Sequence, residues 1–242
     1  DEPVTAAQPA LAALLPGAAT LPGAATPSSR VLVDEPVLFR AINAHFRLGQ
    51  PENAAALAAY AARPDAPSRA RAEALAQLAQ WPKPLQRDRL VGTYRPLAEK
   101  TRDRTVAVAA VEKIAPALLA PGTPAVVQSA ALHALQSLEV AGAASTLFAM
   151  VRDAQQNGAT RAAALTTLDK IKDPRLAEAV QLAGESADST LRLAALPIAS
   201  RLSPETAAPV VANLIARGTT DEKKSAFRTL GFSRHATANT LL

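Results

Sequence analysis

Residues 161–165 read RAAAL, and close variants of this pentapeptide recur along the chain. RAEAL occupies 71–75 and RLAAL occupies 192–196, while QSAAL at 128–132 and KKSAF at 223–227 are looser copies. In chain order, the last four of these five pentapeptides end at Leu132, Leu165, Leu196 and Phe227. These end positions are spaced by 33, 31 and 31 residues. A fixed period in this range with helical patterning is typical of stacked helix pairs. We therefore predict an all-α solenoid of antiparallel helix pairs, with these four residues as equivalent buried anchors.

The residues between the anchors predict where helices begin and end. Ser203 followed by Pro204 is a favoured helix start, and Gly218 is a favoured stop. Thr219 and Glu222 have the spacing of a capping box that opens the next helix. Further helices are expected over 36–49, 51–63, 67–80, 105–120, 124–139 and 189–202. Prolines at 116 and 197 should kink two of them, which resembles the kinked first helices of HEAT repeats.

Composition shifts divide the chain into four segments. Residues 1–33 are expected to hold a short helix over 3–15, followed by a connection that contains PGAAT twice. We expect this helix to be the second helix of a repeat whose first helix precedes the given sequence. Residues 34–80 hold a helix pair and the first helix of the next pair. Residues 81–104 form an irregular basic insertion, and 105–242 form HEAT-like repeats that we expect to continue past the end of the sequence. With no initiator Met, the chain is expected to be a segment of a longer protein.

The composition excludes several kinds of site. The chain has no Cys, so it has no disulfide, thiolate metal site, Cys nucleophile or covalent haem attachment of its own. No apolar stretch is continuous enough to predict a membrane span. The net charge is +5, and the window 63–104 alone holds ten basic and five acidic residues. The whole excess of positive charge therefore lies around the insertion, which favours a localised docking surface.

The insertion carries the most varied side chains of the sequence. Its core reads WPKPLQRDRLVGTYRPL over 81–97 and interleaves aromatic residues with arginines: Trp81, Arg87, Arg89, Tyr94 and Arg95. In one interpretation the two aromatic residues fill the gap left by a displaced helix, with Leu90 as a second anchor and the arginines outside. In another, the five residues form a surface for a protein partner. Stacking on nucleic acid is a third interpretation.

The remaining polar residues do not assemble into a recognisable catalytic or metal-binding motif. The three histidines, His45, His133 and His235, are far apart and are expected to be packed or surface residues. We predict no catalytic, cofactor-binding or metal-binding residue in this chain. The arginines that open the repeated pentapeptide, Arg71, Arg161 and Arg192, have two interpretations. In the first, their side-chain stems cover apolar surface, and their guanidinium groups bind acidic side chains or the carbonyl groups at helix ends. In the second, they form a ladder of ligand-binding groups.

The run LFRAINAHFRLGQPENAAALAAYAARPDAPSRARAEALAQLAQWPKPLQRDRLVGTYRPL over 38–97 resembles the HEAT-repeat region of PVC-type haem-binding CxxCH proteins. The stretch over 216–242 is similar to the final repeats of that region. The resemblance implies a parent with three parts: a sugar-dehydrogenase-like β-propeller of the pyrroloquinoline-quinone and sorbosone dehydrogenase type, these helical repeats, and a cytochrome c domain. This sequence contains no CxxCH, so none of the family's catalytic or haem-ligating residues maps onto it.

Two functions remain open from the sequence. The first is a non-catalytic scaffold within a periplasmic or secreted redox protein, where it would position the dehydrogenase-like domain relative to the haem domain in electron transfer. The parent, not this chain, would then carry haem c and pyrroloquinoline quinone as cofactors, and the partners would be neighbouring domains or another protein. The alternative is a free-standing HEAT-like protein that binds proteins or nucleic acid, although the neutral charge outside 63–104 argues against nucleic acid.

Overall fold

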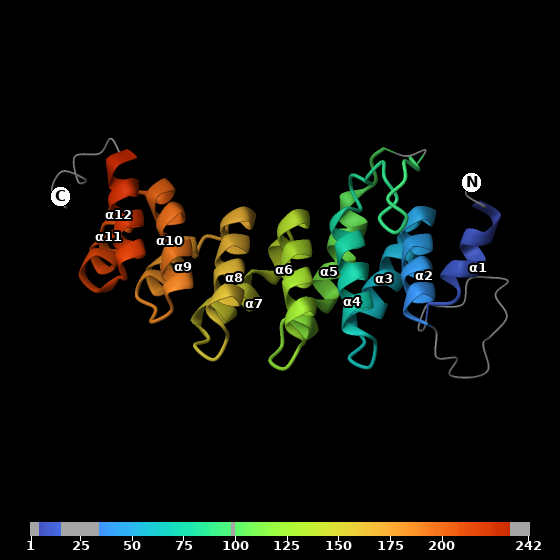
Figure 1. Cartoon of the computed structure of the whole chain (residues 1–242), viewed down its shortest axis with the longest axis horizontal. Coiled ribbons are helices and arrows are strands. Elements are labelled where there is room, and N and C mark those ends of the chain that lie inside the picture. Colours follow the sequence, from blue (N-terminus) through green and yellow to red (C-terminus); the bar gives the residue numbers. More distant parts are fainter. Residues whose placement is uncertain (1–4, 16–33, 98–99, 233–242) are drawn as a thin grey trace. The chain divides into compact units, whose positions relative to one another are not determined.

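The computed structural model describes residues 5–15, 34–97 and 100–232, and within these ranges the regular structure is helical (Figure 1). The prediction of an all-α fold is therefore confirmed. The only β-type pairing in the described ranges is one isolated bridge, between Arg87 and Tyr94. The chain divides into two compact units, the first ending at Val140 and the second beginning at Ala141. A boundary at this point was not predicted, because the sequence pattern is periodic on both sides of it.

The described residues of the first unit form one short 3-10 helix and six α-helices. Their bounds are η1 Thr5–Ala7, α1 Gln8–Ala12, α2 Glu35–Leu48, α3 Pro51–Ala62, α4 Ser68–Ala79, α5 Arg104–Leu118 and α6 Ala125–Leu138. Helix α4 packs against both α2 and α6, while α3 packs against α5. Alternate helices along the chain are therefore neighbours in space, and α1 packs on α2.

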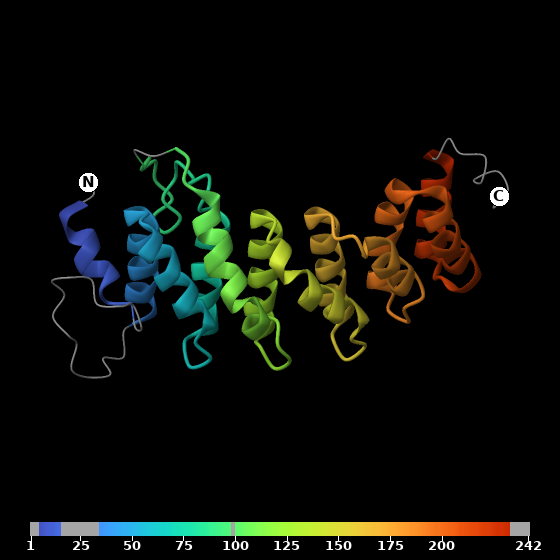
Figure 2. The same ribbon diagram turned by 180° about the vertical axis from the view of Figure 1, so that it is seen from behind.

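The second unit repeats this arrangement. Its elements are η2 Ala141–Ala143, α7 Ala144–Arg152, α8 Gly158–Ile171, α9 Leu176–Gly184, α10 Ser189–Leu202, α11 Pro204–Arg217 and α12 Thr220–Phe232. Helices α8, α10 and α12 contact one another in succession, and so do α7, α9 and α11. The view from behind shows the same order of helices along this unit (Figure 2).

Side-chain caps fix the beginnings of several helices. The side chains of Asp103, Asn157, Asp188 and Ser203 each accept a hydrogen bond from a backbone N–H in the first turn of the helix that follows. The predicted capping box is present as well: Thr219 N–H donates to Glu222 Oε2 over 2.7 Å, and Glu222 N–H donates to Thr219 Oγ1 over 3.3 Å. These contacts satisfy N–H groups that have no partner within the helix.

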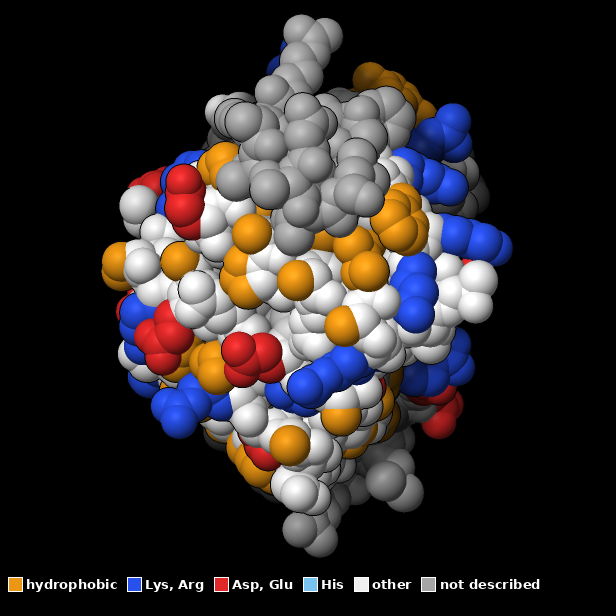
Figure 3. Space-filling model, turned by 90° about the vertical axis from the view of Figure 1, so that its left-hand side faces the viewer, with side chains coloured by type: hydrophobic (Ala, Val, Ile, Leu, Met, Phe, Trp, Pro, Cys, Tyr) orange, Lys and Arg blue, Asp and Glu red, His pale blue; other side chains and the backbone are white. Residues whose placement is uncertain are grey.

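Three of the four predicted anchors are buried. Leu132, Leu165 and Leu196 lie in the cores of their units, but Phe227 is 47% exposed, so its assignment as an anchor is wrong. In the described part of the chain no helix follows α12 to cover this side chain, whereas α9 covers α8 and α11 covers α10. Ala226, one residue earlier, is fully buried. In the view from the α11 and α12 end, apolar side chains share the surface with Lys and Arg (Figure 3).

Prolines lie inside helices as the sequence predicted. Pro116 is within α5 and Pro197 is within α10, and Pro209 is a further case inside α11. Among the described residues, no helix combines the length and the apolar character that crossing a membrane requires.

Candidate functional site

The insertion between α4 and α5 is anchored by one aromatic residue. No helix forms in the described residues 80–97 and 100–103. Trp81 is 1% exposed and meets Phe46 of α2 edge to face, with ring centroids 6.0 Å apart. The Arg102 guanidinium lies 5.0 Å from the Phe46 ring centroid and 4.9 Å from that of Trp81. Both ends of the insertion therefore pack on α2 through aromatic and cation–π contacts.

The same arginine caps the C-terminus of α2. Arg102 donates through Nη1 to the Phe46 carbonyl and through Nη2 to the Arg47 carbonyl, and its backbone N–H donates to Pro82 O over 3.1 Å. Helix α2 ends at Gly49, whose φ of 72° is left-handed. A Cβ at this position would lie 2.6 Å from the guanidinium. Only glycine suits both the turn and the close approach of Arg102.

Between these ends the chain forms a short hairpin-like loop over 86–95. Arg87 and Tyr94 form the isolated bridge, and Arg95 N–H donates to Gln86 O over 3.0 Å. Gly92, with φ of 68°, turns the loop, and its N–H donates to Asp88 O over 2.8 Å. The loop is thus held by its own backbone hydrogen bonds.

Asp88 attaches this loop to α2. Its buried carboxylate accepts hydrogen bonds from Asn43 Nδ2 at 3.0 Å, Leu90 N–H at 2.9 Å and Val91 N–H at 3.3 Å. Arg47 Nη1 lies 3.6 Å from Asp88 Oδ2. Burial acts to raise the pKa of Asp88, but these hydrogen bonds and the Arg47 charge together hold the pKa below its ordinary value. Asp88 therefore stays ionised at neutral pH.

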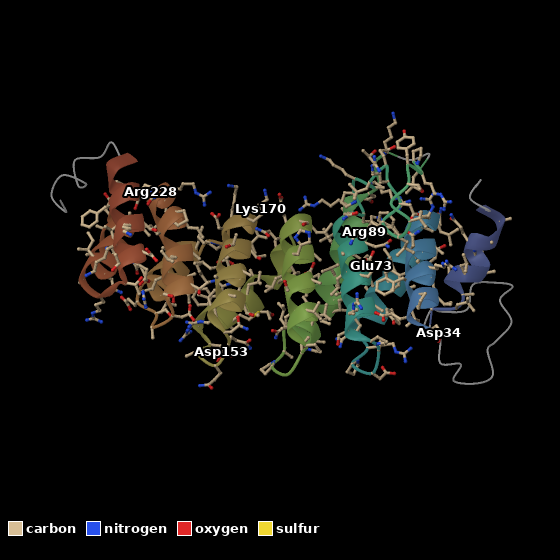
Figure 4. The ribbon with its side chains drawn as sticks, viewed as in Figure 1. Asp34, Glu73, Arg89, Asp153, Lys170 and Arg228 are labelled. Atoms are coloured by element: carbon tan, nitrogen blue, oxygen red, sulfur yellow. The ribbon has the colours of Figure 1, made fainter. Side chains whose placement is uncertain are left out.

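The structure separates the five candidate docking residues. Trp81 is buried, so its assignment to a docking surface is wrong. Tyr94 is 69% exposed, so the interpretation that it fills a gap is wrong as well. Arg89 is committed to α4, because it donates to both carboxylate oxygens of Glu73 over 2.9 and 3.0 Å (Figure 4). Arg87 is exposed and donates to the Gly92 carbonyl, and Arg95 is half-buried.

Exposed apolar side chains accompany Tyr94 on the insertion. Leu85 and Val91 are each 51% exposed, and Lys83 and Arg87 of the same segment are exposed as well. We call these five residues (Lys83, Leu85, Arg87, Val91 and Tyr94) the outer face of the insertion. Figure 4 shows side chains projecting from this loop. Leu90, the second predicted anchor, is only half-buried.

Most of the basic residues of the window 63–104 are engaged within the chain. Seven of the ten contact a carboxylate or a backbone carbonyl of another described residue: Arg63, Arg69, Arg71, Arg87, Arg89, Arg102 and Arg104. Among the described residues, the side chains of Lys83, Arg95 and Lys100 have no such partner. Most of these basic side chains therefore make contacts within the fold, and four of them (Arg63, Arg69, Arg89 and Arg104) pair with a carboxylate, which reduces the charge available to nucleic acid.

The recurrent arginines confirm the structural interpretation. Arg71 Nε donates to Ala61 O over 2.8 Å, and Arg161 Nε donates to Val151 O over 3.0 Å, in each case near the end of the preceding helix. Gln128, the residue of the looser copy at this position, donates to Ala120 O over 3.2 Å. Arg192 donates to both carboxylate oxygens of Glu222 over 2.8 and 3.0 Å. The repeated position therefore ties each helix to a neighbour.

The two described histidines are structural or exposed, as predicted. His45 is buried; Asn53 Nδ2 donates to its Nδ1 over 3.0 Å, and its Nε2 lies 2.9 Å from Ala12 O, which fits a neutral ring protonated on Nε2. His133 is exposed, and His235 lies outside the described residues. Within the described ranges no three His, Asp or Glu side chains are placed to hold a metal ion.

Next to the insertion lies a cavity that the sequence did not predict. Its volume is about 220 Å³, and α1, α2 and the loop 86–95 line it, with polar or charged contributions from Gln8, Arg40, Asn43, Arg47, Asp88 and Arg95. The pairing of Asp88 with a glycine four residues later was a turn signal in the sequence. The α2 residues gave no signal, because their partners are more than forty positions away.

Comparison with known proteins adds no assignment to this geometry. No family model matches the chain, and neither a curated protein nor a solved structure is significantly similar to it.

Proposed function

We propose that this chain is a non-catalytic HEAT-type scaffold, an α-solenoid of stacked helix pairs that presents the outer face of the insertion to a protein partner or a neighbouring domain. The observation that carries the proposal is the exposure of Tyr94, Leu85 and Val91 on a loop whose base is fixed by Trp81 and Asp88. Exposed aromatic and aliphatic side chains beside an arginine have the composition of protein-binding hot spots.

The fixed base of the loop favours binding. Ordering a flexible loop opposes association, and a loop that is already held in place avoids this cost. Trp81 and Arg102 hold the two ends of the insertion on α2, and Asp88 holds its middle. The outer face is therefore available to a partner in one conformation, with Tyr94 and Arg87 paired across the loop.

The solenoid part of the proposal rests on the helix contacts within each unit. In the first unit α2, α4 and α6 contact in succession, and in the second unit α8, α10 and α12 do so. Together with the period of about thirty residues in the sequence, alternating neighbours of this kind are what stacked helix pairs produce.

The larger context proposed for this scaffold is a periplasmic or secreted redox protein. Its support is the resemblance of residues 38–97 to the helical region of haem-binding CxxCH proteins. In that context haem c and pyrroloquinoline quinone would belong to neighbouring domains, and the scaffold would set their separation. Sequencing the encoding gene tests this: a propeller upstream and a CxxCH motif downstream are expected, and their absence would overturn the redox context but not the docking surface.

A binding measurement tests the outer face directly. A triple variant that combines Leu85→Ser, Arg87→Ser and Tyr94→Ser should bind an adjacent domain encoded by the same gene at least tenfold more weakly in calorimetry. Its thermal melting temperature should be unchanged. The matched control combines Val126→Ser, Lys113→Ser and Phe227→Ser, three exposed residues of the same chemical kinds outside the insertion. Equal loss in both triple variants, or no loss in the first, would remove the outer face as the docking site.

A further inference from the structure

The cavity beside the insertion combines an apolar wall with an excess of positive charge. Leu11 of α1 and Leu90 and Val91 of the loop contribute apolar surface to it. Arg40 and Arg47 reach it from α2, and Arg95 reaches it from the loop. Asp88 is its only acidic lining residue among those described, so the lining carries a net charge of about +2 at neutral pH, as side chains with ordinary ionisation would give.

Two of these arginines have no side-chain partner among the described residues. No side-chain hydrogen bond or ion pair joins Arg40 or Arg95 to another described residue, in contrast to most arginines of this unit. Arg40 is exposed and Arg95 is half-buried. Like charges that line one small cavity repel each other, and a bound anion offsets that repulsion.

The third cation, Arg47, is largely buried and is only partly satisfied by the described residues. The Arg47 side chain is 10% exposed and that of Asp88 is 4% exposed. Arg47 Nη1 donates to the Arg95 carbonyl over 3.2 Å, and among the described residues this is the one hydrogen bond of its guanidinium. The 3.6 Å separation from Asp88 Oδ2 is longer than a hydrogen bond, and Asp88 itself is satisfied by Asn43 and two backbone N–H groups. Arg47 thus keeps donors for a further acceptor.

We propose that this cavity binds a small organic dianion, whose acidic oxygens pair with Arg40 and Arg95 and whose carbon chain lies against Leu11 and Leu90. A guanidinium donates two parallel hydrogen bonds to a carboxylate or a phosphate, so either acidic group satisfies the site. The charge of the lining matches two negative charges. The inference does not depend on the docking function of the outer face. Val91 belongs to both surfaces, but the ligand would pair with Arg40 and Arg95, which lie outside the outer face.

The size of the cavity limits the ligand. A volume of about 220 Å³ is below the roughly 300–1,000 Å³ of sites for drug-sized molecules. A short dicarboxylate or a small phosphate ester fits this range, whereas a nucleotide does not. Because α1 contributes Gln8 and Leu11, a bound ligand would also join α1 to α2 and the insertion.

Calorimetric titration of the full chain at low salt tests the proposal with three probes: glutarate, inorganic phosphate and the monoanion butyrate. We expect glutarate or phosphate to bind with a Kd near or below 1 mM, and butyrate to bind at least tenfold more weakly. The stronger of the two dianions identifies the acidic group.

A double variant that combines Arg40→Gln with Arg95→Gln should weaken binding of the stronger dianion at least tenfold. Lys83→Gln combined with Lys100→Gln removes the same charge from exposed positions outside the cavity, and should change it less than twofold.

Three results would overturn the proposal: no binding of either dianion below 10 mM, equal weakening by the two double variants, or binding of a Glu-containing peptide but of neither dianion. If the Gln pair does not fold, Arg40→Lys with Arg95→Lys keeps the charges but loses the planar fork, and should still weaken binding severalfold. Amide chemical shifts give a second readout, because ligand-induced changes should centre on 40–47 and 86–95. Changes confined to other regions would also contradict the site.

Discussion

At the scale of single residues, Trp81 and Tyr94 share a chemical class and have opposite roles. Trp81 is 1% exposed and packs on Phe46, whereas Tyr94 is 69% exposed. We expect Trp81→Ala to lower the free energy of unfolding by about 3–5 kcal/mol, the usual range for a buried large aromatic residue. Tyr94→Ala should change it by less than about 0.5 kcal/mol. Urea unfolding followed by circular dichroism measures both, and similar losses would contradict this placement.

The second prediction at this scale concerns His45 and pH. Burial lowers the pKa of His45, and the hydrogen bond to the Ala12 carbonyl opposes this shift only in part. Because the folded pKa is lower than the unfolded pKa, the unfolded chain takes up the proton first as the pH falls. The His45 contribution to stability is therefore fully present above about pH 7 and declines as the pH falls through about 6.5.

Denaturant unfolding between pH 7.5 and pH 5 should show this decline, and His45→Gln should flatten it. His133→Gln is the matched control, because His133 is exposed and should leave the slope unchanged. Asp88, whose pKa is lowered, adds a separate loss only at pH values below about 4, as the pH falls through its folded pKa. If the free energy of unfolding still declines between pH 7.5 and pH 5 in His45→Gln, another group causes that decline.

At the scale of helices, the recurrent arginine connects consecutive elements. Arg161 donates through Nε and Nη2 to the Val151 carbonyl, over 3.0 and 2.8 Å, and is itself buried. Arg161→Met keeps the apolar stem but leaves this carbonyl unsatisfied, so it should cost about 1–3 kcal/mol. Arg201→Met is the control: the Arg201 side chain is 63% exposed and its ion pair with Asp169 should be worth less than about 1 kcal/mol. Thermal melts that rank the two variants in the reverse order would refute the assignment.

The anchor positions give a second prediction at this scale. Leu165 is fully buried between α8 and its neighbours, and Leu165→Ala should cost about 2–5 kcal/mol. Phe227 holds the equivalent sequence position but is 47% exposed, so Phe227→Ala should cost less than about 1 kcal/mol. Chemical denaturation of the two variants checks this difference. A large loss for Phe227→Ala would mean that this side chain has a buried contact after all.

At the scale of the whole molecule, the charge of +5 and the sequence pI of about 9.9 are poor guides to binding. Seven of the ten basic residues in 63–104 contact acceptors within the described chain. We therefore expect duplex DNA to bind more weakly than about 1 μM near physiological salt, with a shallow dependence on salt concentration. A filter-binding titration at several salt concentrations measures both quantities. Tight binding with a steep slope would favour the nucleic-acid function.

The sequence alone determined the helical class, most helix bounds and the capping residues. These features depend on neighbours within one or two turns, as Ser203 with Thr206 and Thr219 with Glu222 show. The period of the repeated pentapeptide also located Leu132, Leu165 and Leu196 in the core, because each lies on a helix that others cover. The pattern failed at Phe227, since periodicity cannot tell an inner helix from the last described one.

The tertiary structure decided the site. The burial of Trp81 depends on Phe46 of α2, which is distant in the sequence, and on Arg102 at the other end of the insertion. The cavity depends in the same way on the meeting of α1, α2 and the loop 86–95, which are separated in the sequence. Local propensity fixes a helix because its hydrogen bonds are local. The pairing of charges and aromatic rings across the insertion is set by distant contacts, which only the folded chain brings together.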